Sequence, residues 1–199
     1  TNRYGAGKRI DFHPTSVVEL KKLFAIVLIM GLVKQPQTRS YWFKKARLGT
    51  ELYRHDLVAS AMSRNRFEEL FSYLHFRDVV TLTAEERERL RSEDALYLVS
   101  EFTDMLCENY SRYFECGDYI DIDEMCIRFK GRHSFRFFIP SKPARYHFRA
   151  YCLSDQSGYL YCFYLYRGTR DHEQTIYSAS AFPVAKLTDS DVFRNKKIG

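Results

Sequence analysis

Apolar residues recur at helical spacing in the first half of the chain. Ser16 and Glu19 form an S-x-x-E capping box, which predicts the start of a helix that runs through an apolar stretch to Gly31. Because apolar residues lie almost all round this helix, we expect it to be buried on most sides. A second helix is expected to begin near Ser63. Its apolar residues have the i, i+3, i+4, i+7 spacing of one helix face: Phe67, Leu70, Phe71 and Leu74.

Two more helices are predicted before the pattern changes. Thr83 and Glu86 open a short, highly charged helix that we expect to be a solvated connector. A longer helix follows Ser92 and ends at Gly117. It carries one apolar stripe: Leu96, Val99, Phe102, Leu106, Tyr110 and Phe114. Together these segments predict a helical region over residues 1–117.

After the last of these helices the period of the pattern changes from 3.6 to 2. Residues Tyr119–Ile127 predict a strand, since Ile120 and Ile122 alternate with the acidic residues between them. Strand residues point alternately to opposite faces. We therefore expect Asp121 and Asp123 on the face opposite to the two isoleucines.

Further strands follow this first one. Tyr146–Leu153 and Tyr159–Arg167 predict two strands, joined by the hairpin turn sequence Asp155–Gly158. A helix is expected somewhere within Ala179–Phe193, although Pro183 interrupts it. The predicted fold class is α+β, with the helical region followed by a strand domain that starts at residue 118 and runs to residue 199.

The composition is that of a globular protein, with 199 residues, 45% hydrophobic and 28% charged. The longest apolar run, Leu23–Val33, is too short to cross a bilayer. It also lacks the cleavage site of a secretory signal. We therefore expect no membrane segment.

The five cysteines show no zinc-binding pattern, since no two are spaced as C-x-x-C. Three of them lie in strand-like segments, where a buried thiol acts as a small hydrophobe: Cys126, Cys152 and Cys162. We expect reduced core cysteines, as in nuclear or cytoplasmic proteins, rather than disulfides or metal ligands.

The positive charge is concentrated in one segment. The net charge is +6, and between Met125 and Ser154 the chain has no acidic residue. This window contains seven bases: Arg128, Lys130, Arg132, Arg136, Lys142, Arg145 and Arg149. Such a concentration is typical of a phosphate-binding surface, with a solvated face as the alternative.

Acidic residues lie directly before this basic window. Asp121, Asp123 and Glu124 are on the first predicted strand. Carboxylates can hold Mg²⁺ for phosphoryl chemistry while neighbouring Lys and Arg side chains hold DNA phosphates. On spacing alone, the pattern favours the alternative, which is acids at the end of a surface strand.

Several motifs resemble those of piggyBac-type transposases and occur in the same order. Four lie in the strand region: I-D-E at Ile122–Glu124, F-K-G-R at Phe129–Arg132, I-P-S-K-P at Ile139–Pro143 and S-G-Y at Ser157–Tyr159. Upstream, Gly31–Trp42 and Met62–Asp78 resemble the helical region of the family. The resemblance covers nearly the whole chain.

This resemblance implies an RNase H-like core in which three aspartates bind two divalent ions, Mg²⁺, and cut and rejoin DNA, typically at TTAA sites. The first of these aspartates corresponds to Asp123, which is thereby expected to be catalytic and a metal ligand. The second and third are expected beyond Gly199, so the chain is expected to be an inactive fragment. The strand next to Tyr119–Ile127 would also follow Gly199, leaving that edge without a partner. Asp155 is no substitute, because it sits in the hairpin turn.

The resemblance also implies DNA contacts in the basic window. The residues expected to bind DNA phosphates are Arg128, Lys130, Arg132, Arg136, Lys142 and Arg145. His133 and His147 lie among these bases, and we expect them to donate to phosphate rather than to bind metal.

Four other residues are expected to support the fold rather than to bind a ligand. Glu124 is expected to pair with a base. Arg64 and Arg66 are expected to cap and solvate a helix. Trp42 is expected to anchor the core.

We therefore predict part of a nuclear DNA transposase, with DNA as its partner and no membrane or small-molecule substrate. Homodimerisation is an option for the parent protein. The alternative is a domesticated relative that binds DNA or chromatin without cutting it. A third interpretation, a protein-interaction module built on the helices, has no positive feature in its favour.

Overall fold

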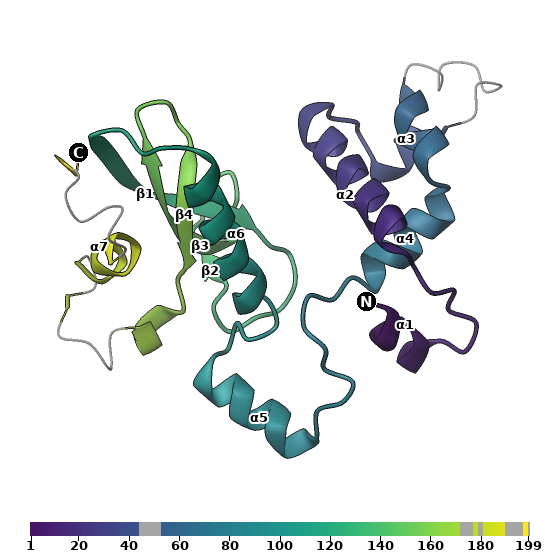
Figure 1. Cartoon of the computed structure of the whole chain (residues 1–199), viewed down its shortest axis with the longest axis horizontal. Coiled ribbons are helices and arrows are strands. Elements are labelled where there is room, and N and C mark those ends of the chain that lie inside the picture. The colour runs from purple at the N-terminus through teal and green to yellow at the C-terminus, as the bar shows by residue number, and fades with distance from the viewer. Residues whose placement is uncertain (44–52, 172–176, 179–180, 190–196, 199) are drawn as a thin grey trace. The chain divides into compact units, whose positions relative to one another are not determined.

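The chain forms two compact units, Thr1–Asp94 and Ala95–Gly199, which we call the helical unit and the sheet unit (Figure 1). Helices precede strands along the chain, which confirms the predicted α+β class. The computed structural model describes the following residues: 1–43, 53–171, 177–178, 181–189 and 197–198.

The helical unit contains α1 (Asn2–Lys8), α2 (Val17–Leu32), the 3-10 helix η1 (Thr38–Trp42), α3 (Asp56–Ala61), α4 (Arg64–Ser72) and α5 (Ala84–Glu93). Ser16, Ser63 and Thr83 each accept a hydrogen bond from the backbone N–H three residues later, which confirms the predicted helix starts. The periodicity did not predict α1 or α3. None of the described helices is both long and apolar enough to span a membrane.

The core of the helical unit lies between α2, α3 and α4. Leu23 and Ile26 of α2 are fully buried with Leu70 of α4. The opposite face of α2 is open, since Leu28 and Leu32 are 70% and 86% exposed. The expectation that α2 is buried on most sides is therefore wrong, because α3 and α4 cover one stripe of it.

Trp42 is a core anchor, which confirms its predicted role. Its indole Nε1 donates to the carbonyl oxygen of Met62 at 2.7 Å. Its ring packs against that of Phe67, with centroids 5.1 Å apart. The indole therefore ties η1 to the end of α3 and to α4.

Arg66 clamps α4 to α2. Its Nε and Nη2 atoms donate to the two carboxylate oxygens of Glu19 at 2.8 Å each, and Nη1 donates to Glu69 at 2.7 Å. The side chain is only 17% exposed. The expectation that Arg66 is solvated is therefore wrong, whereas Arg64 does lie on the surface beside Glu68.

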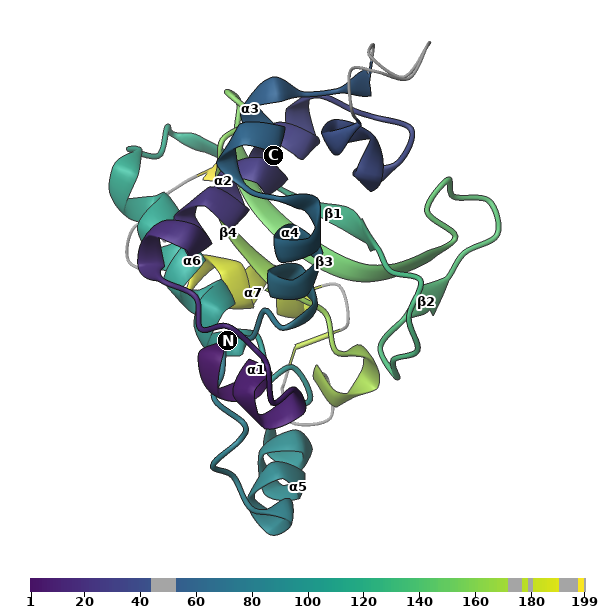
Figure 2. The ribbon, with the colours of Figure 1, turned by 90° about the vertical axis from the view of Figure 1, so that its right-hand side faces the viewer.

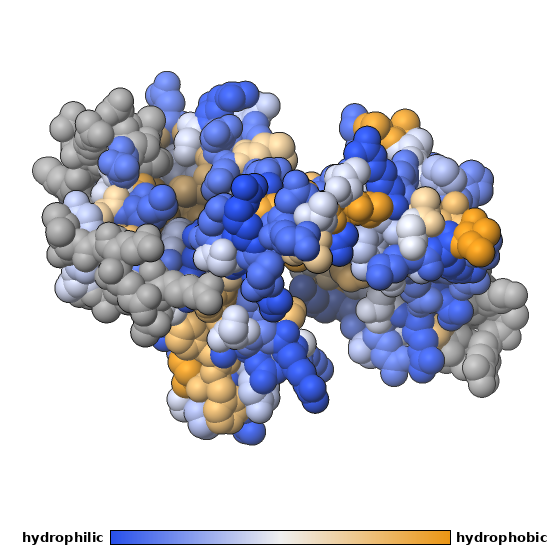
Figure 3. All heavy atoms as spheres, turned by 90° about the horizontal axis from the view of Figure 1, so that it is seen from below, coloured by the Kyte–Doolittle hydropathy of each residue, from blue (hydrophilic) through white to orange (hydrophobic). Residues whose placement is uncertain are grey.

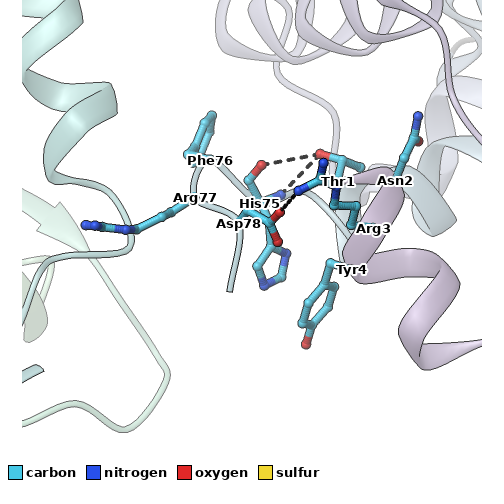
Figure 4. A pocket seen from close by; sticks show the side chains of 8 residues that line it. All are labelled: Thr1, Asn2, Arg3, Tyr4, His75, Phe76, Arg77 and Asp78. Carbon is cyan, nitrogen blue, oxygen red and sulfur yellow. Dashed lines mark hydrogen bonds and ion pairs between the residues drawn. The ribbon is translucent and has the colours of Figure 1, made fainter. Parts of the chain in front are cut away.

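The first residues of the chain are fixed beside the segment that follows α4 (Figure 4). The hydroxyl of Thr1 accepts a hydrogen bond from the backbone N–H of His75 at 3.3 Å. The ring of Tyr4 stacks on His75 with centroids 3.5 Å apart, and Arg3 forms an ion pair with Asp78. These residues line a cleft of about 310 Å³. α1 is therefore an integral part of the helical unit.

The sheet unit contains α6 (Ser100–Tyr113), β1 (Tyr119–Arg128), β2 (Phe137–Phe138), β3 (Tyr146–Asp155), β4 (Leu160–Leu165), η3 (Gly168–Asp171), α7 (Ala181–Thr188) and β5 (Lys197–Ile198). Strands β1, β3 and β4 confirm the three predicted strands. The hairpin turn is confirmed too: Gly158 has φ +79°, and its N–H donates to Asp155 at 2.9 Å. α7 lies within Ala179–Phe193, the range predicted to contain a helix. Residues 179–180 and 190–193 of that range are outside the part of the chain that the structure describes. Pro183 is in the first turn of α7, where the missing N–H costs little.

α6 is shorter than predicted. It begins at Ser100 rather than after Ser92, because α5 continues to Glu93 and turns separate the two helices. It ends at Tyr113 rather than at Gly117, because the backbone is already extended at the next residue.

α6 covers the outer edge of β4. The thiol of Cys107 accepts the N–H of Phe163 at 3.3 Å and donates to its carbonyl at 3.5 Å. One turn later, Ser111 donates to the carbonyl of Tyr161 at 3.2 Å. Side chains of α6 thus satisfy backbone groups that a further strand would otherwise pair. This packing makes α6 part of the sheet unit. The sheet unit begins at Ala95, which precedes the point where the periodicity of the sequence changes from 3.6 to 2.

β1 lies inside the sheet. It pairs with β3 in an unbroken antiparallel register from Ile120 to Arg128, and β3 pairs on its other side with β2 and β4. On its far edge, β1 pairs in parallel with the two residues of β5. The expectation that this neighbour lies wholly beyond Gly199 is wrong, because it begins at Lys197.

The core of the sheet unit lies between the strands and α7. Ile120, Leu153 and Tyr161 are fully buried and cluster with Leu187 of α7. The hydroxyl of Tyr161 donates to the carboxylate of Asp155 at 2.8 Å. α6 and α7 approach β4 from different sides (Figure 1).

The Glu19–Arg66 pair predicts that acid weakens the helical unit. Hydrogen bonds from Arg66 are the largest cause that lowers the pKa of Glu19 from 4.5 to about 2. Because the folded-state pKa is the lower one, the stabilisation is complete above about pH 4.5 and is lost as the pH falls towards 2. Arg66→Met should lower the free energy of unfolding by about 2 kcal/mol at about pH 7, and by less than half as much at about pH 3.

Urea unfolding followed by circular dichroism at both pH values measures this difference. Arg64→Met is the matched control, because its surface ion pair should contribute about 0.5 kcal/mol or less. An equal loss for Arg66→Met at both pH values would contradict the role of the ion pair.

The far edge of β1 predicts self-association. Among the described residues, Asp121 to Arg128 have no strand partner on that side, and Met125 and Ile127 are 39% and 37% exposed. Unpaired N–H and C=O groups on an apolar strand are a template for pairing with another chain. Light scattering should therefore rise with concentration, and Ile127→Lys should suppress the rise.

Leu28→Lys, on the open face of α2, is the matched control and should leave the association unchanged. A monodisperse wild-type protein would contradict the prediction. So would association that Leu28→Lys removes and Ile127→Lys does not.

Candidate nucleic-acid interface

A basic arm, residues 128–146, connects the end of β1 to the start of β3. It contains β2 and has no acidic residue. The loops on either side of β2 project beyond the rest of the sheet unit (Figure 2). Cations on the arm can therefore approach a ligand without a competing carboxylate in the same segment.

Backbone hydrogen bonds give the arm a defined shape. The N–H of Phe129 donates to Tyr146 at 3.0 Å, and that of Ile139 donates to Arg145 at 2.9 Å. The two residues of β2 pair with the first two of β3. The backbone of the arm is therefore an extension of the sheet.

Arg149 connects the arm to the strand that carries the acids. Its Nη1 lies 3.3 Å from Oε1 of Glu124, which confirms that Glu124 pairs with a base. Its guanidinium carbon lies 4.8 Å from the ring centroid of Phe137 and 5.8 Å from that of Tyr166. Arg149 therefore holds the arm in place and is occupied by these contacts.

The six cations predicted to bind DNA fall into two groups. Lys130, Arg132 and Arg145 are exposed and have no hydrogen-bond or ion-pair partner among the described residues. We call these three the unpaired cations. The others contact the protein itself: Arg128 donates to Pro143 at 3.4 Å, Lys142 to the thiol of Cys126 at 3.7 Å, and Arg136 to Gly131 at 2.6 Å.

His147 does not have the phosphate-binding role expected from the sequence. It is fully buried, and its Nδ1 lies 2.7 Å from the carbonyl oxygen of Ala144. It cannot donate to phosphate there, because its side chain points into the interior of the sheet unit. His133 is exposed, and its Nδ1 accepts the N–H of Phe135 at 3.2 Å, so a phosphate contact stays a prediction for this residue.

Asp123 is exposed on β1, opposite Cys152 of β3. Its Oδ1 accepts the backbone N–H of Glu124 at 2.7 Å. Because strand residues alternate, Asp121 shares its face and the Glu124 side chain points to the other. Burial, and then the charge of Asp123, raise the pKa of the Cys152 thiol. The thiol therefore stays protonated beside the carboxylate.

The described residues do not complete a metal centre by themselves. They contain no group of three or more His, Cys, Asp or Glu side chains placed to hold a metal ion. Asp123 offers a carboxylate to a hard cation, which would need further oxygen ligands. Asp155 is engaged in its turn, where hydrogen bonds from Ser157 and then Tyr161 lower its pKa.

The structural roles of Arg136 and Arg149 were missed by the sequence reasoning. Arg136 lies 4.3 Å from the ring centroid of Tyr146, and Arg149 stacks on Phe137. The alternation F-R-F-F at Phe135–Phe138 was the available signal, because Arg among aromatic residues forms cation–π contacts.

All five cysteines are free thiols in the structure.

Comparison with known proteins identifies relatives over most of the chain. The family model described as "Transposase IS4" matches residues 1–190. The human PiggyBac transposable element-derived protein 3 is 30% identical over 169 residues, which cover 84% of this chain and 26% of that protein. The human PiggyBac transposable element-derived protein 2 is 27% identical, with 85% and 26% covered. The chain thus spans about a quarter of the length of these curated relatives.

A solved structure has the same fold. The cryo-EM structure of the piggyBac transposase synaptic complex with hairpin DNA superposes with a TM-score of 0.73 at 22% sequence identity. The match covers 99% of this chain and 45% of the solved one. Both units, and the order of helices before strands, therefore have a counterpart in that structure.

Proposed function

The chain belongs to the IS4-type transposase family, in its piggyBac branch, and we propose that it is part of a DNA transposase that binds DNA through the basic arm. The observation that carries this proposal is the family match over residues 1–190, which includes the whole arm and Asp123. The unpaired cations support it, because exposed Lys and Arg side chains without carboxylates nearby attract phosphate. A nuclear location is part of the proposal, since the partner is DNA.

The proposal assigns Asp123 as a ligand for a divalent cation, by analogy with the aspartates of the family. Mg²⁺ bound there would activate the attacking oxygen and stabilise charge on the phosphate. In this proposal Asp123 is the first of the three aspartates that the resemblance implies. We propose that the 199 residues do not cut DNA without the other two.

A second candidate function is DNA or chromatin binding without cleavage. The names of the two human relatives, transposable element-derived proteins, favour it. Both candidates need the basic arm, and only the first needs Asp123.

DNA affinity tests the role of the arm. We expect the protein to bind duplex DNA with little sequence preference and a steep salt dependence. Each neutralised phosphate contributes about −0.9 to the slope of log K against log salt concentration. Replacing Lys130, Arg132 and Arg145 by Gln should reduce this slope by about 0.9 for each residue that contacts a phosphate.

Fluorescence anisotropy over a salt series measures the slope. The matched control replaces three exposed lysines of the helical unit by Gln: Lys21, Lys22 and Lys34. An equal reduction by the control would show that the arm has no special part in binding. Affinity that is unmeasurable at low salt would remove the DNA-binding proposal.

Cleavage tests the role of Asp123. In a polypeptide that also supplies the other two aspartates, Asp123→Asn should abolish Mg²⁺-dependent cutting and leave DNA affinity nearly unchanged. The amide has the same shape but is a far poorer ligand for a hard cation. Asp121→Asn, on the same strand face, is the control and should be much milder. Equal cutting by wild type and Asp123→Asn would exclude Asp123 from the catalytic set.

A further inference from the structure

Three side chains of the basic arm form a cluster with two exposed rings, whose planes are tilted by 34° to each other. The guanidinium carbon of Arg136 lies 4.3 Å from the ring centroid of Tyr146, and the ring of Phe138 lies 4.8 Å from that of Tyr146. Phe138 is 55% exposed and Tyr146 43% exposed. We call Arg136, Tyr146 and Phe138 the aromatic platform.

The platform is held in place by the framework of the arm. Phe138 and Tyr146 are directly opposite each other in the β2–β3 ladder. Arg136 donates to the carbonyl oxygen of Gly131 at 2.6 Å, which fixes its guanidinium group over Tyr146. The backbone pairing and the Arg136 hydrogen bond therefore place the three side chains next to one another before a ligand binds.

Its surroundings distinguish the platform from an ordinary apolar patch. Arg145, one of the unpaired cations, lies in the loop between Phe138 and Tyr146, and the segment has no acidic residue. The lobe of the sheet unit at the lower left of Figure 3 likewise shows apolar residues directly beside strongly hydrophilic ones. An open aromatic face beside cations suits a ligand that offers a flat ring and a phosphate together.

A nucleotide offers this combination, provided that its base is not paired and stacked inside a duplex. Every base has a π-face, and stacking on an aromatic side chain is worth roughly a tenfold gain in affinity or more for each base. We propose that the aromatic platform binds an unpaired nucleobase, so that the arm prefers DNA with opened base pairs to fully paired DNA. This inference rests on the proposed DNA binding and names the form of DNA that the arm selects.

The test compares two DNA duplexes with the same number of phosphates. One is fully paired, and in the other the central base pairs are replaced by thymine mismatches. The wild-type protein should bind the mismatched duplex about tenfold more tightly. Phe138→Leu should remove this preference and change affinity for the paired duplex less than about twofold, because it keeps the bulk and loses the π-face.

Phe138→Trp should retain the preference, because it restores a larger aromatic face. Phe71→Leu is the matched control, since this equally exposed ring lies on α4 in the helical unit, and it should have no effect. A fluorescent base analogue in the mismatched region should be quenched by the wild type and not by Phe138→Leu.

Each remaining outcome overturns the inference. Salt-dependent binding without preference for the mismatched duplex would overturn it and leave the proposed function standing. An equal loss on both duplexes in Phe138→Leu would give Phe138 a structural role only. No binding of either duplex would overturn the inference and the proposed function together.

Discussion

The antiparallel pairing of β1 with β3 is the constraint on which the rest of the sheet unit depends. Its register runs without a break from Ile120 to Arg128. Because side chains alternate along a strand, this one register places Asp123 on one face and Glu124 on the other. It also sets the two ends of the basic arm side by side, so that β2 can pair with β3. A slip of one residue would exchange the faces and break the contact between Glu124 and Arg149.

Local patterns predicted the elements whose cause is local. Alternation predicted β1, and a hairpin turn sequence marked the connection of β3 to β4. Capping motifs predicted the starts of α2 and α5, and apolar spacing predicted α4. Two of the failed expectations concern residues that are far apart in sequence. Arg66 meets Glu19 across 47 positions, and β5 reaches β1 from the other end of the unit. A periodicity read within a short window of sequence cannot reveal such long-range contacts. It also cannot reveal that His147 is buried.

The basic arm shows why counting charges overestimates a ligand surface. Four of the seven bases in its window are engaged with the protein: Arg128, Arg136, Lys142 and Arg149. They hold the arm in shape and leave Lys130, Arg132 and Arg145 for phosphate. Composition alone could locate the window, because an acid-free run is visible in the sequence. The sequence does not show which cations contact the protein itself and which are available to a ligand. That depends on the carbonyl groups, rings and carboxylates around each cation, which only the structure shows.

The proposed function requires the sheet unit to bind DNA through the basic arm, on a scaffold set by β1 and β3. Amide hydrogen exchange of the protein with and without duplex DNA tests it most directly, because exchange reports protection residue by residue. DNA bound to the arm should slow exchange within residues 129–146 and leave α2 and α4 nearly unchanged. Protection confined to the helical unit, with none in the arm, would contradict it.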